Sequence, residues 1–348
     1  MKSNYRYIVK AFMAMAVIAG TTSCDDFLDR EPMSSISPET YYSTAAQLEA
    51  NLNDEYPNVL PSFGQWTYGI FGEDKGTDNQ IEVNANDRYT QDRWKVPHSE
   101  SDNWKFERIY RINFFLSEAL PKFGEDMSGS QNTISGSVAT IKHYIGEMYF
   151  LRAYEYFKKL QLFGDFPIIN QPLADEMEAL REASKRFPRN EVARFIISDL
   201  DKAYAYMSDV DMATTRINKD AAMLVKSRVA LFEATWLQNF KGTAFVPGGE
   251  GWPGASLHNN YQYPSGNLDN EVKYFLEQAV EASKLVADKY KGNLTENTGV
   301  LQQSADDPSN PYFDMFAQED LSDVKEVLLW RQYARGCLLY TSPSPRDS

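Results

Sequence analysis

The chain has 348 residues, a length that suits two ordinary domains or one large helical domain. Hydrophobic residues make up 43% of it, which excludes a disordered chain, and its two cysteines, Cys24 and Cys337, are too few for a disulfide framework or a structural zinc site. The net charge of −14 disfavours nucleic acid and an anionic membrane surface as partners, and it suits a body that faces water.

Residues 1–23 have the pattern of a secretory signal peptide. Positive charges precede the apolar segment 11–20, which is too short to span a bilayer, because a spanning helix needs about 20 residues. Cys24 directly follows small residues, and this arrangement resembles a bacterial lipobox, which implies cleavage before Cys24 and a lipid anchor on it. Asp25 and Asp26 resemble the acidic tag of surface-exported lipoproteins in Bacteroidetes-type bacteria. The alternative is an ordinary cleaved signal with an incidental cysteine.

Apolar residues recur with helical spacing from residue 43 onward. Thr44 and Gln47 have the spacing of a capping box, and Pro121 is expected to stop the second helix. Pro188 precedes the fourth helix, and Asn218 is expected to cap the fifth. The pattern predicts six helices, at about 44–59, 102–120, 134–161, 190–207, 218–236 and 269–290.

Each predicted helix has one apolar face and one charged face, so each needs a neighbour to cover its apolar side. The last four helices are similar to stacked antiparallel pairs of the tetratricopeptide type, although their starts are irregularly spaced. Strand-like alternation is weak and confined to Gln80–Asn84. Two long polar and aromatic stretches, 61–101 and 240–267, interrupt the helices, and loops of this length are usually functional or disordered.

Residue patterns that would indicate catalysis or a cofactor are weak in this sequence. The glycine pattern in 249–254 has the spacing of a dinucleotide loop, but it contains Pro253 and lacks a convincing strand before it. The oxygen-rich stretch 73–80 does not follow the order of a calcium-binding loop. The histidines lie far apart and in no metal spacing: His98, His143 and His258. We therefore expect a binding protein without catalytic residues, metal or cofactor.

One stretch of the sequence carries a recognisable signature. The segment 146–169, GEMYFLRAYEYFKKLQLFGDFPII, resembles the signature of the SusD/RagB family in its Leu-Arg-Ala triplet, its aromatic run and its Gly-Asp-x-Pro turn. Three further blocks are similar to the family's helices, and with the lipobox the resemblance covers about 24–290: DNWKFERIYRINFFL, FPRNEVARFIISDLDKA and TRINKDAAMLVKSRVALFEATW. We interpret the signature residues as structural: Arg152 is expected to pair with a buried acid or with helix ends, and Gly164–Pro167 to form a helix stop and turn.

This resemblance implies an all-α fold, a tetratricopeptide-like right-handed superhelix with long inserted loops. It also implies a lipoprotein, exposed on the outer membrane, that binds a glycan and passes it to a SusC-like TonB-dependent transporter. A peptide-binding member of the same family is the alternative, and a glycoside hydrolase is a more distant one. Residues 24–336 would form an incomplete SusD-like domain, whereas 337–348 lack a helical period and resemble a non-native tail.

The ligand residues are expected in the two long loops, because stacking on a sugar needs an exposed ring beside polar groups. In the stretch 61–101 the candidates are two rings and two hydroxyl-binding side chains: Trp66, Trp94, Asn84 and Arg88. Trp94 is the first choice, because its neighbours in the sequence are polar and unlike those of a core tryptophan. Trp252 and Tyr261 of the second loop are the alternative. The competing interpretation of Trp66 and Trp94 is that they plug the loop onto the helices.

Overall fold

The computed structural model describes residues 41–61, 80, 103–124, 126–208, 212–301, 304, 306–316 and 318–332. The predicted signal peptide 1–23, Cys24 and the tail 337–348 lie outside these ranges, as does most of the weak strand pattern. The described parts are helical and contain two isolated β-bridges but no strand. Their longer elements are α4 (Ala45–Val59), α5 (Glu107–Phe123), α6 (Val138–Phe163), α8 (Arg189–Tyr206), α9 (Lys219–Asn239) and α10 (Leu268–Tyr290).

These six helices are the six that the sequence predicts, and side-chain caps explain where several of them begin. Thr44 and Gln47 form both arms of the expected capping box at α4. Ser137, Asn218 and Asn267 accept a backbone N–H at the starts of α6, α9 and α10, respectively. Each such cap contributes about 1 kcal/mol relative to alanine. The starts of α5 and α6 fall a few residues later than predicted.

The prediction that Pro121 stops the second helix is wrong, because α5 continues to Phe123 and ends at Gly124. A proline removes one hydrogen bond of the helix, and here that loss falls in the last turn, where few bonds remain. Phe123 is fully buried, and the N–H of Gly124 closes the turn on the carbonyl of Leu120. Burial of the Phe123 ring therefore stabilises the last helical residues beyond the proline.

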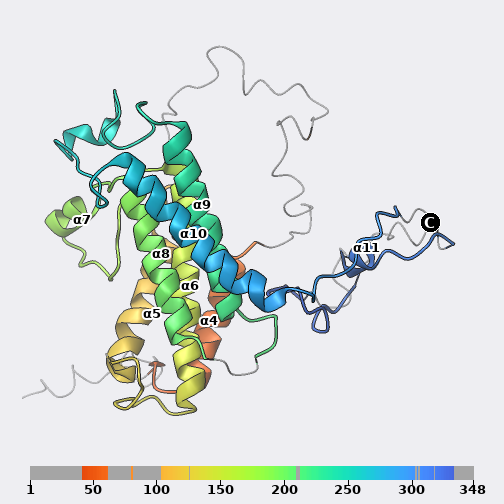
Figure 1. Cartoon of the computed structure of the whole chain (residues 1–348). Helices are drawn as coiled ribbons and strands as arrows, with labels where there is room; N and C mark the ends of the chain where they lie inside the picture. The colour runs from red at the N-terminus through yellow and green to blue at the C-terminus, as the bar shows by residue number, and fades with distance from the viewer. Residues whose placement is uncertain are drawn as a thin grey trace, which may run out of the picture. The chain divides into compact units, whose positions relative to one another are not determined.

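Helices α5, α6, α8, α9 and α10 pack against one another in chain order, and α4 packs on α6 (Figure 1). The α6–α8 pair is antiparallel, since Tyr149 stacks on Tyr206 while Tyr156 contacts Phe195. None of the helices in these described ranges has the length and apolar run needed to cross a bilayer. The all-α, tetratricopeptide-like class predicted from the sequence is confirmed.

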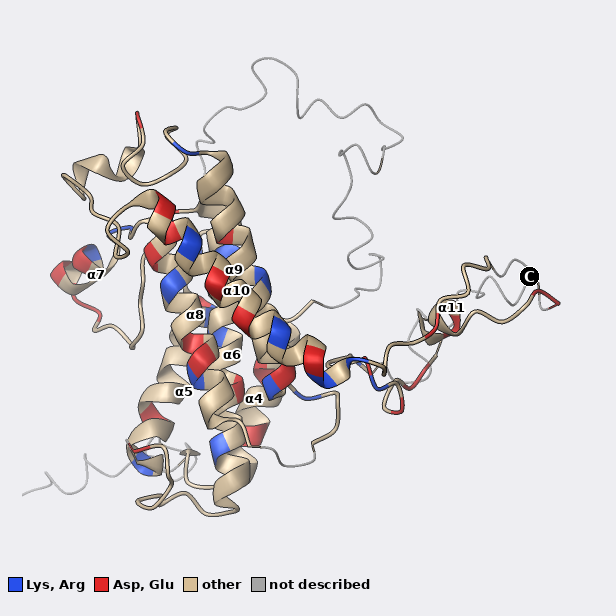
Figure 2. Cartoon of the chain, viewed as in Figure 1, with Lys and Arg blue, Asp and Glu red and all other residues tan. Residues whose placement is uncertain are grey.

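Charged residues are interspersed along the helices (Figure 2), and several of them pair inside the protein. Between α6 and α8, Arg152 donates to both carboxylate oxygens of Asp199, at 2.6 and 2.8 Å. This pair confirms that Arg152 meets a buried acid, since Asp199 is fully buried. Two similar pairs join α8 to the helices that follow it: Arg189–Glu233 to α9 and Arg194–Glu271 to α10. Ion pairs thus connect α8 to α6, to α9 and to α10, in addition to the apolar contacts between the helices.

The turn after α6 is structural, as predicted. Gly164 ends the helix with φ of 69°, a left-handed conformation that glycine adopts without strain. The carboxylate of Asp165 then accepts the backbone N–H of Arg189 at 2.9 Å and the indole N–H of Trp252 at 2.7 Å. This one side chain therefore ties the end of α6 to the start of α8 and to the loop after α9.

Two lysines of α6 bind the chain where the stretch 62–102 leaves and rejoins the described helices. Lys158 donates to the carbonyl of Val59 at 2.9 Å, and Lys159 donates to that of Asn103 at 2.8 Å. Both ammonium groups also lie near the buried carboxylate of Glu155, at 2.7 and 3.4 Å. One acid of α6 thus supports both ends of this stretch.

Candidate functional site

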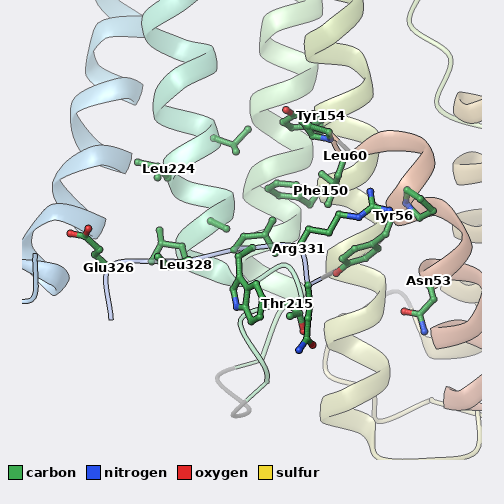
Figure 3. A pocket seen from close by; sticks show the side chains of 18 residues that line it. Asn53, Tyr56, Leu60, Phe150, Tyr154, Thr215, Leu224, Glu326, Leu328 and Arg331 are labelled. Carbon is green, nitrogen blue, oxygen red and sulfur yellow. The ribbon is translucent and has the colours of Figure 1, made fainter. Parts of the chain in front are cut away.

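A cavity of about 830 Å³ lies between α4, α6, α9 and two connecting segments (Figure 3). This volume falls within the range of about 300–1,000 Å³ that is typical of ligand pockets. Its lining includes four aromatic residues, Tyr56, Phe150, Tyr154 and Trp330, and polar side chains of Asn53, Thr215, Glu326, Arg331 and Gln332. We call it the aromatic pocket.

The rings of the aromatic pocket come from three segments that lie far apart in the sequence. Tyr56 stands on α4, Phe150 and Tyr154 stand one turn apart on α6, and their rings gather on one side of the pocket (Figure 3). Phe150 is buried and stacks in parallel on Tyr154, whereas Tyr154 is only half-buried. Trp330, also half-buried, faces the pocket from the segment 326–332. The pocket therefore offers flat apolar surfaces that remain accessible.

The segment 326–332 forms one wall of the aromatic pocket and is held by the connection 212–218 before α9. Trp330 bonds to Thr214 twice: its backbone N–H donates to the carbonyl at 3.1 Å, and its indole N–H donates to the hydroxyl at 2.8 Å. Asn218 donates to the carbonyl of Leu328 at 2.6 Å. The position of the Trp330 ring thus depends on a connection that is itself outside the helices.

This connection is anchored in turn to a buried carboxylate of α6. Glu147 is fully buried and accepts two bonds from Arg216, at 2.9 and 2.7 Å, and one from the hydroxyl of Tyr56 at 2.8 Å. His143 Nε2 lies 3.1 Å from the same carboxylate. Burial, together with the charge of Glu147, raises the pKa of Tyr56 well above its usual value, so this hydroxyl stays a donor.

The structure leaves most of the sequence-predicted site residues undescribed. Trp66, Asn84, Arg88 and Trp94 lie outside the described residues, as does Cys24. The structure therefore does not test the roles predicted for them.

Trp252 and Tyr261 of the second loop are described, and the structure brings their rings together with centroids 5.5 Å apart. Trp252 is only 5% exposed, stacks on His258 and donates its indole N–H to Asp165. Tyr261 is half-buried and bonds Asn190 at 3.0 Å. A ring that is already packed cannot also stack on a sugar, so the ligand role predicted for Trp252 needs correction: it anchors the loop.

Sequence reasoning missed the aromatic pocket. Tyr56 and Tyr154 lie in predicted helices, where their spacing indicates core positions, and Trp330 follows a region without periodicity. The signal that was available is the aromatic run of the 146–169 signature, since Phe150 and Tyr154 belong to it. In the described parts of the chain no group of three or more His, Cys, Asp or Glu side chains could hold a metal ion.

Comparison with known proteins finds similarity to SusD-like proteins of two bacteria. A SusD-like protein P25 of Formosa agariphila is 25% identical over 233 residues, covering 62% of this chain and 41% of the relative. A second protein of that organism, P2, is 25% identical over 253 residues, covering 69% of this chain and 46% of the relative. A solved SusD-like protein of Bacteroides fragilis superposes with a TM-score of 0.43 at 21% identity, over 61% of this chain and 39% of that chain.

The chain spans less than half the length of these relatives. Residues 26–231 match the SusD-like family that is described as starch-binding and associating with the outer membrane. This range contains the 146–169 signature with its Arg152–Asp199 pair, and it takes in more than half of the chain. The protein belongs to the SusD-like family.

Proposed function

We propose that this protein is a lipid-anchored surface protein that binds a glycan in the aromatic pocket and delivers it to a SusC-like TonB-dependent outer-membrane transporter. Membership of a family described as starch-binding and associating with the outer membrane supports the glycan and the location. The observation that carries the proposal is the aromatic pocket itself, with accessible rings beside polar side chains.

The chemistry of the pocket suits a sugar chain. Sugar rings present flat faces of C–H groups that pack on aromatic rings such as Tyr154 and Trp330, while hydroxyls need donors and acceptors at the edges. Among the polar side chains of the lining, the amide of Gln332 can supply both, and the amide N–H groups of Asn53 can donate. A sugar with misplaced hydroxyls would leave such groups unpaired, which is the main source of selectivity in polar sites.

The lining of the pocket favours binding over hydrolysis. A glycosidase needs two carboxyl groups that flank the bond to be cleaved. Among the residues that line this pocket, Glu326 is the one acid, and its carboxylate accepts the backbone N–H of Thr295 at 2.9 Å. Trp66, Trp94, Asn84 and Arg88 stay proposed as further ligand contacts from the stretch 61–101, and Tyr261 stays proposed as one from the second loop.

We expect Trp330→Ala to weaken glycan binding about 5- to 150-fold, because a stacked aromatic ring is worth about 1–3 kcal/mol in comparable stacking sites. The measurement is retardation in affinity gels that contain starch or another polysaccharide, after a screen of the unmodified protein on a glycan array. Phe245→Ala is the matched control, because this ring is 61% exposed and lies outside the pocket. Equal retardation of Trp330→Ala and the unmodified protein would show that the glycan does not bind in this pocket.

The proposed membrane attachment rests on Cys24, so Cys24→Ser should abolish incorporation of radioactive palmitate and leave the protein either soluble or uncut at Ser23. The physical reason is that no thiol then remains at this position to carry the lipid, while a serine leaves the signal segment before it unchanged. Cys337→Ser is the control and should label normally. Labelling that persists in Cys24→Ser would show that the anchor is elsewhere.

A further inference from the structure

The connection 212–218 lies between a buried charge cluster of α6 and the wall of the aromatic pocket. At its inner side, Arg216 and Ile217 are bound to Glu147 and Tyr56. Close to these residues in the sequence, Thr214 binds Trp330. The same short segment thus contacts the protein interior and the proposed ligand site.

Several hydrogen bonds to buried groups hold the inner side of the connection 212–218. The guanidinium of Arg216 forms a two-pronged bond to Glu147, and its remaining group donates to Asn53 at 3.0 Å. The hydroxyl of Tyr56 donates to Glu147 and accepts the backbone N–H of Ile217 at 2.9 Å. A buried carboxylate with this many donors holds its partners in one arrangement, because any displacement leaves a charge without a partner.

On the outer side of this connection, Thr214 makes the hydrogen bonds to Trp330 that orient it. The carbonyl and the hydroxyl of Thr214 accept the backbone and indole N–H groups of Trp330, respectively. Two bonds to one residue fix both the place of the tryptophan backbone and the rotation of its ring. Since Trp330 is half-buried, packing alone does not determine that rotation.

We propose that Thr214 and the Glu147–Arg216 pair are positioning residues of the aromatic pocket: they set the orientation of the Trp330 ring and thereby the affinity for ligand. This inference rests on the proposed function, since it takes the ligand to bind against Trp330. None of the three residues needs to touch the ligand. Their effect passes through the backbone of 214–217 to the indole.

The test compares Thr214→Val, which removes the hydroxyl at nearly constant shape, with Thr214→Ser, which keeps it. The full chain is labelled with fluorotryptophan, and the Trp330 signal in the fluorine NMR spectrum is assigned from its loss in Trp330→Phe. We expect Thr214→Val to shift or broaden that signal and to weaken retardation in the polysaccharide gel about two- to ten-fold, the effect of one lost hydrogen bond. Thr214→Ser should restore both, and Thr235→Val on the exposed part of α9 should change neither.

A second variant tests the inner side without contact to the ring. Arg216→Lys keeps the charge but cannot form the two-pronged bond to Glu147. It should move the same Trp330 signal and weaken binding in the same direction. A Trp330 signal that is unchanged in both Thr214→Val and Arg216→Lys would overturn the positioning role, whatever the ligand.

The remaining outcomes separate this inference from the proposed function. If the signal moves and Trp330→Ala weakens binding, but Thr214→Val binds normally, ring orientation does not set affinity and the inference fails. If Trp330→Ala itself binds normally, the proposed ligand site fails. The NMR comparison is then still decisive for whether Thr214 and Arg216 orient the ring.

Discussion

Asp199→Ala should lower the free energy of unfolding by about 3–5 kcal/mol, the usual effect of removing one partner of a buried ion pair. The carboxylate is fully buried, and Arg152, which is 3% exposed, would keep its charge without its partner. Asn113 and the carbonyl of Asn170 are the other acceptors of this guanidinium, at 2.9 and 3.2 Å, and neither carries a charge. Urea unfolding followed by circular dichroism measures the loss.

The control for this experiment is Asp269→Ala, which removes a carboxylate of the exposed pair with Lys241. Exposed pairs are worth about 0–1 kcal/mol, so the control should unfold almost like the unmodified protein. Equal and small losses in both variants would mean that the Arg152–Asp199 pair is not buried in solution.

The second large effect is expected at Gly146, in the middle of α6. A Cβ added here would lie 2.8 Å from the backbone nitrogen of Met207 and 2.9 Å from the carbonyl oxygen of Ala203. Helix propensity favours alanine over glycine by about 1 kcal/mol, but overpacking costs about 1–3 kcal/mol, and backbone atoms cannot move aside as a side chain can. Gly146→Ala should therefore destabilise by about 1 kcal/mol, and Gly146→Val by about 3 kcal/mol.

Ala205, exposed on α8, provides the matched series. There the order of stability should follow helix propensity, with alanine best, valine next and glycine worst, over about 1 kcal/mol. At position 146 the order should be glycine, alanine, valine. Thermal unfolding of the two series decides the matter, and the same order at both positions would show that α6 and α8 do not approach closely at Gly146.

Much of the helical framework could be predicted from the sequence because its signals are local. Asn218 begins α9 where a capping residue precedes a run of apolar spacing, and α4 begins with a capping box that is read directly from Thr44 and Gln47. By contrast, the helix Met177–Ala183 has only seven residues and buries no side chain, so its short apolar spacing cannot be distinguished from that of a loop. Helix length and the burial of an apolar face, rather than helix propensity, decide which helices can be predicted from the sequence.

The aromatic pocket could not be predicted, because its wall and its rings belong to segments that only the packing brings together. Tyr56 and Trp330 both carry a half-buried ring, and nothing local to either residue indicates the other.

Trp252 is the converse case, because the sequence predicts an exposed ring there and the structure buries it. Glycines and polar residues surround it in the sequence, as they would surround an exposed ring. Its indole N–H nevertheless donates to the carboxylate of Asp165, which holds the ring against the protein.

The ion pairs along α8 also restrict how the helices can be aligned. Apolar faces built from similar side chains would tolerate a slide of one helix past another by a turn, about 5.4 Å. Such a slide would carry Arg152 away from Asp199 and Arg189 away from Glu233, and all four groups would remain in the interior without partners. Because α8 carries one charge toward α6, one toward α9 and another toward α10, it sets the register of three neighbours at once. The cost of unpaired buried charges thus raises the free energy of slipped and mispaired arrangements of these helices above that of the native one. Apolar packing alone would separate these arrangements less in free energy.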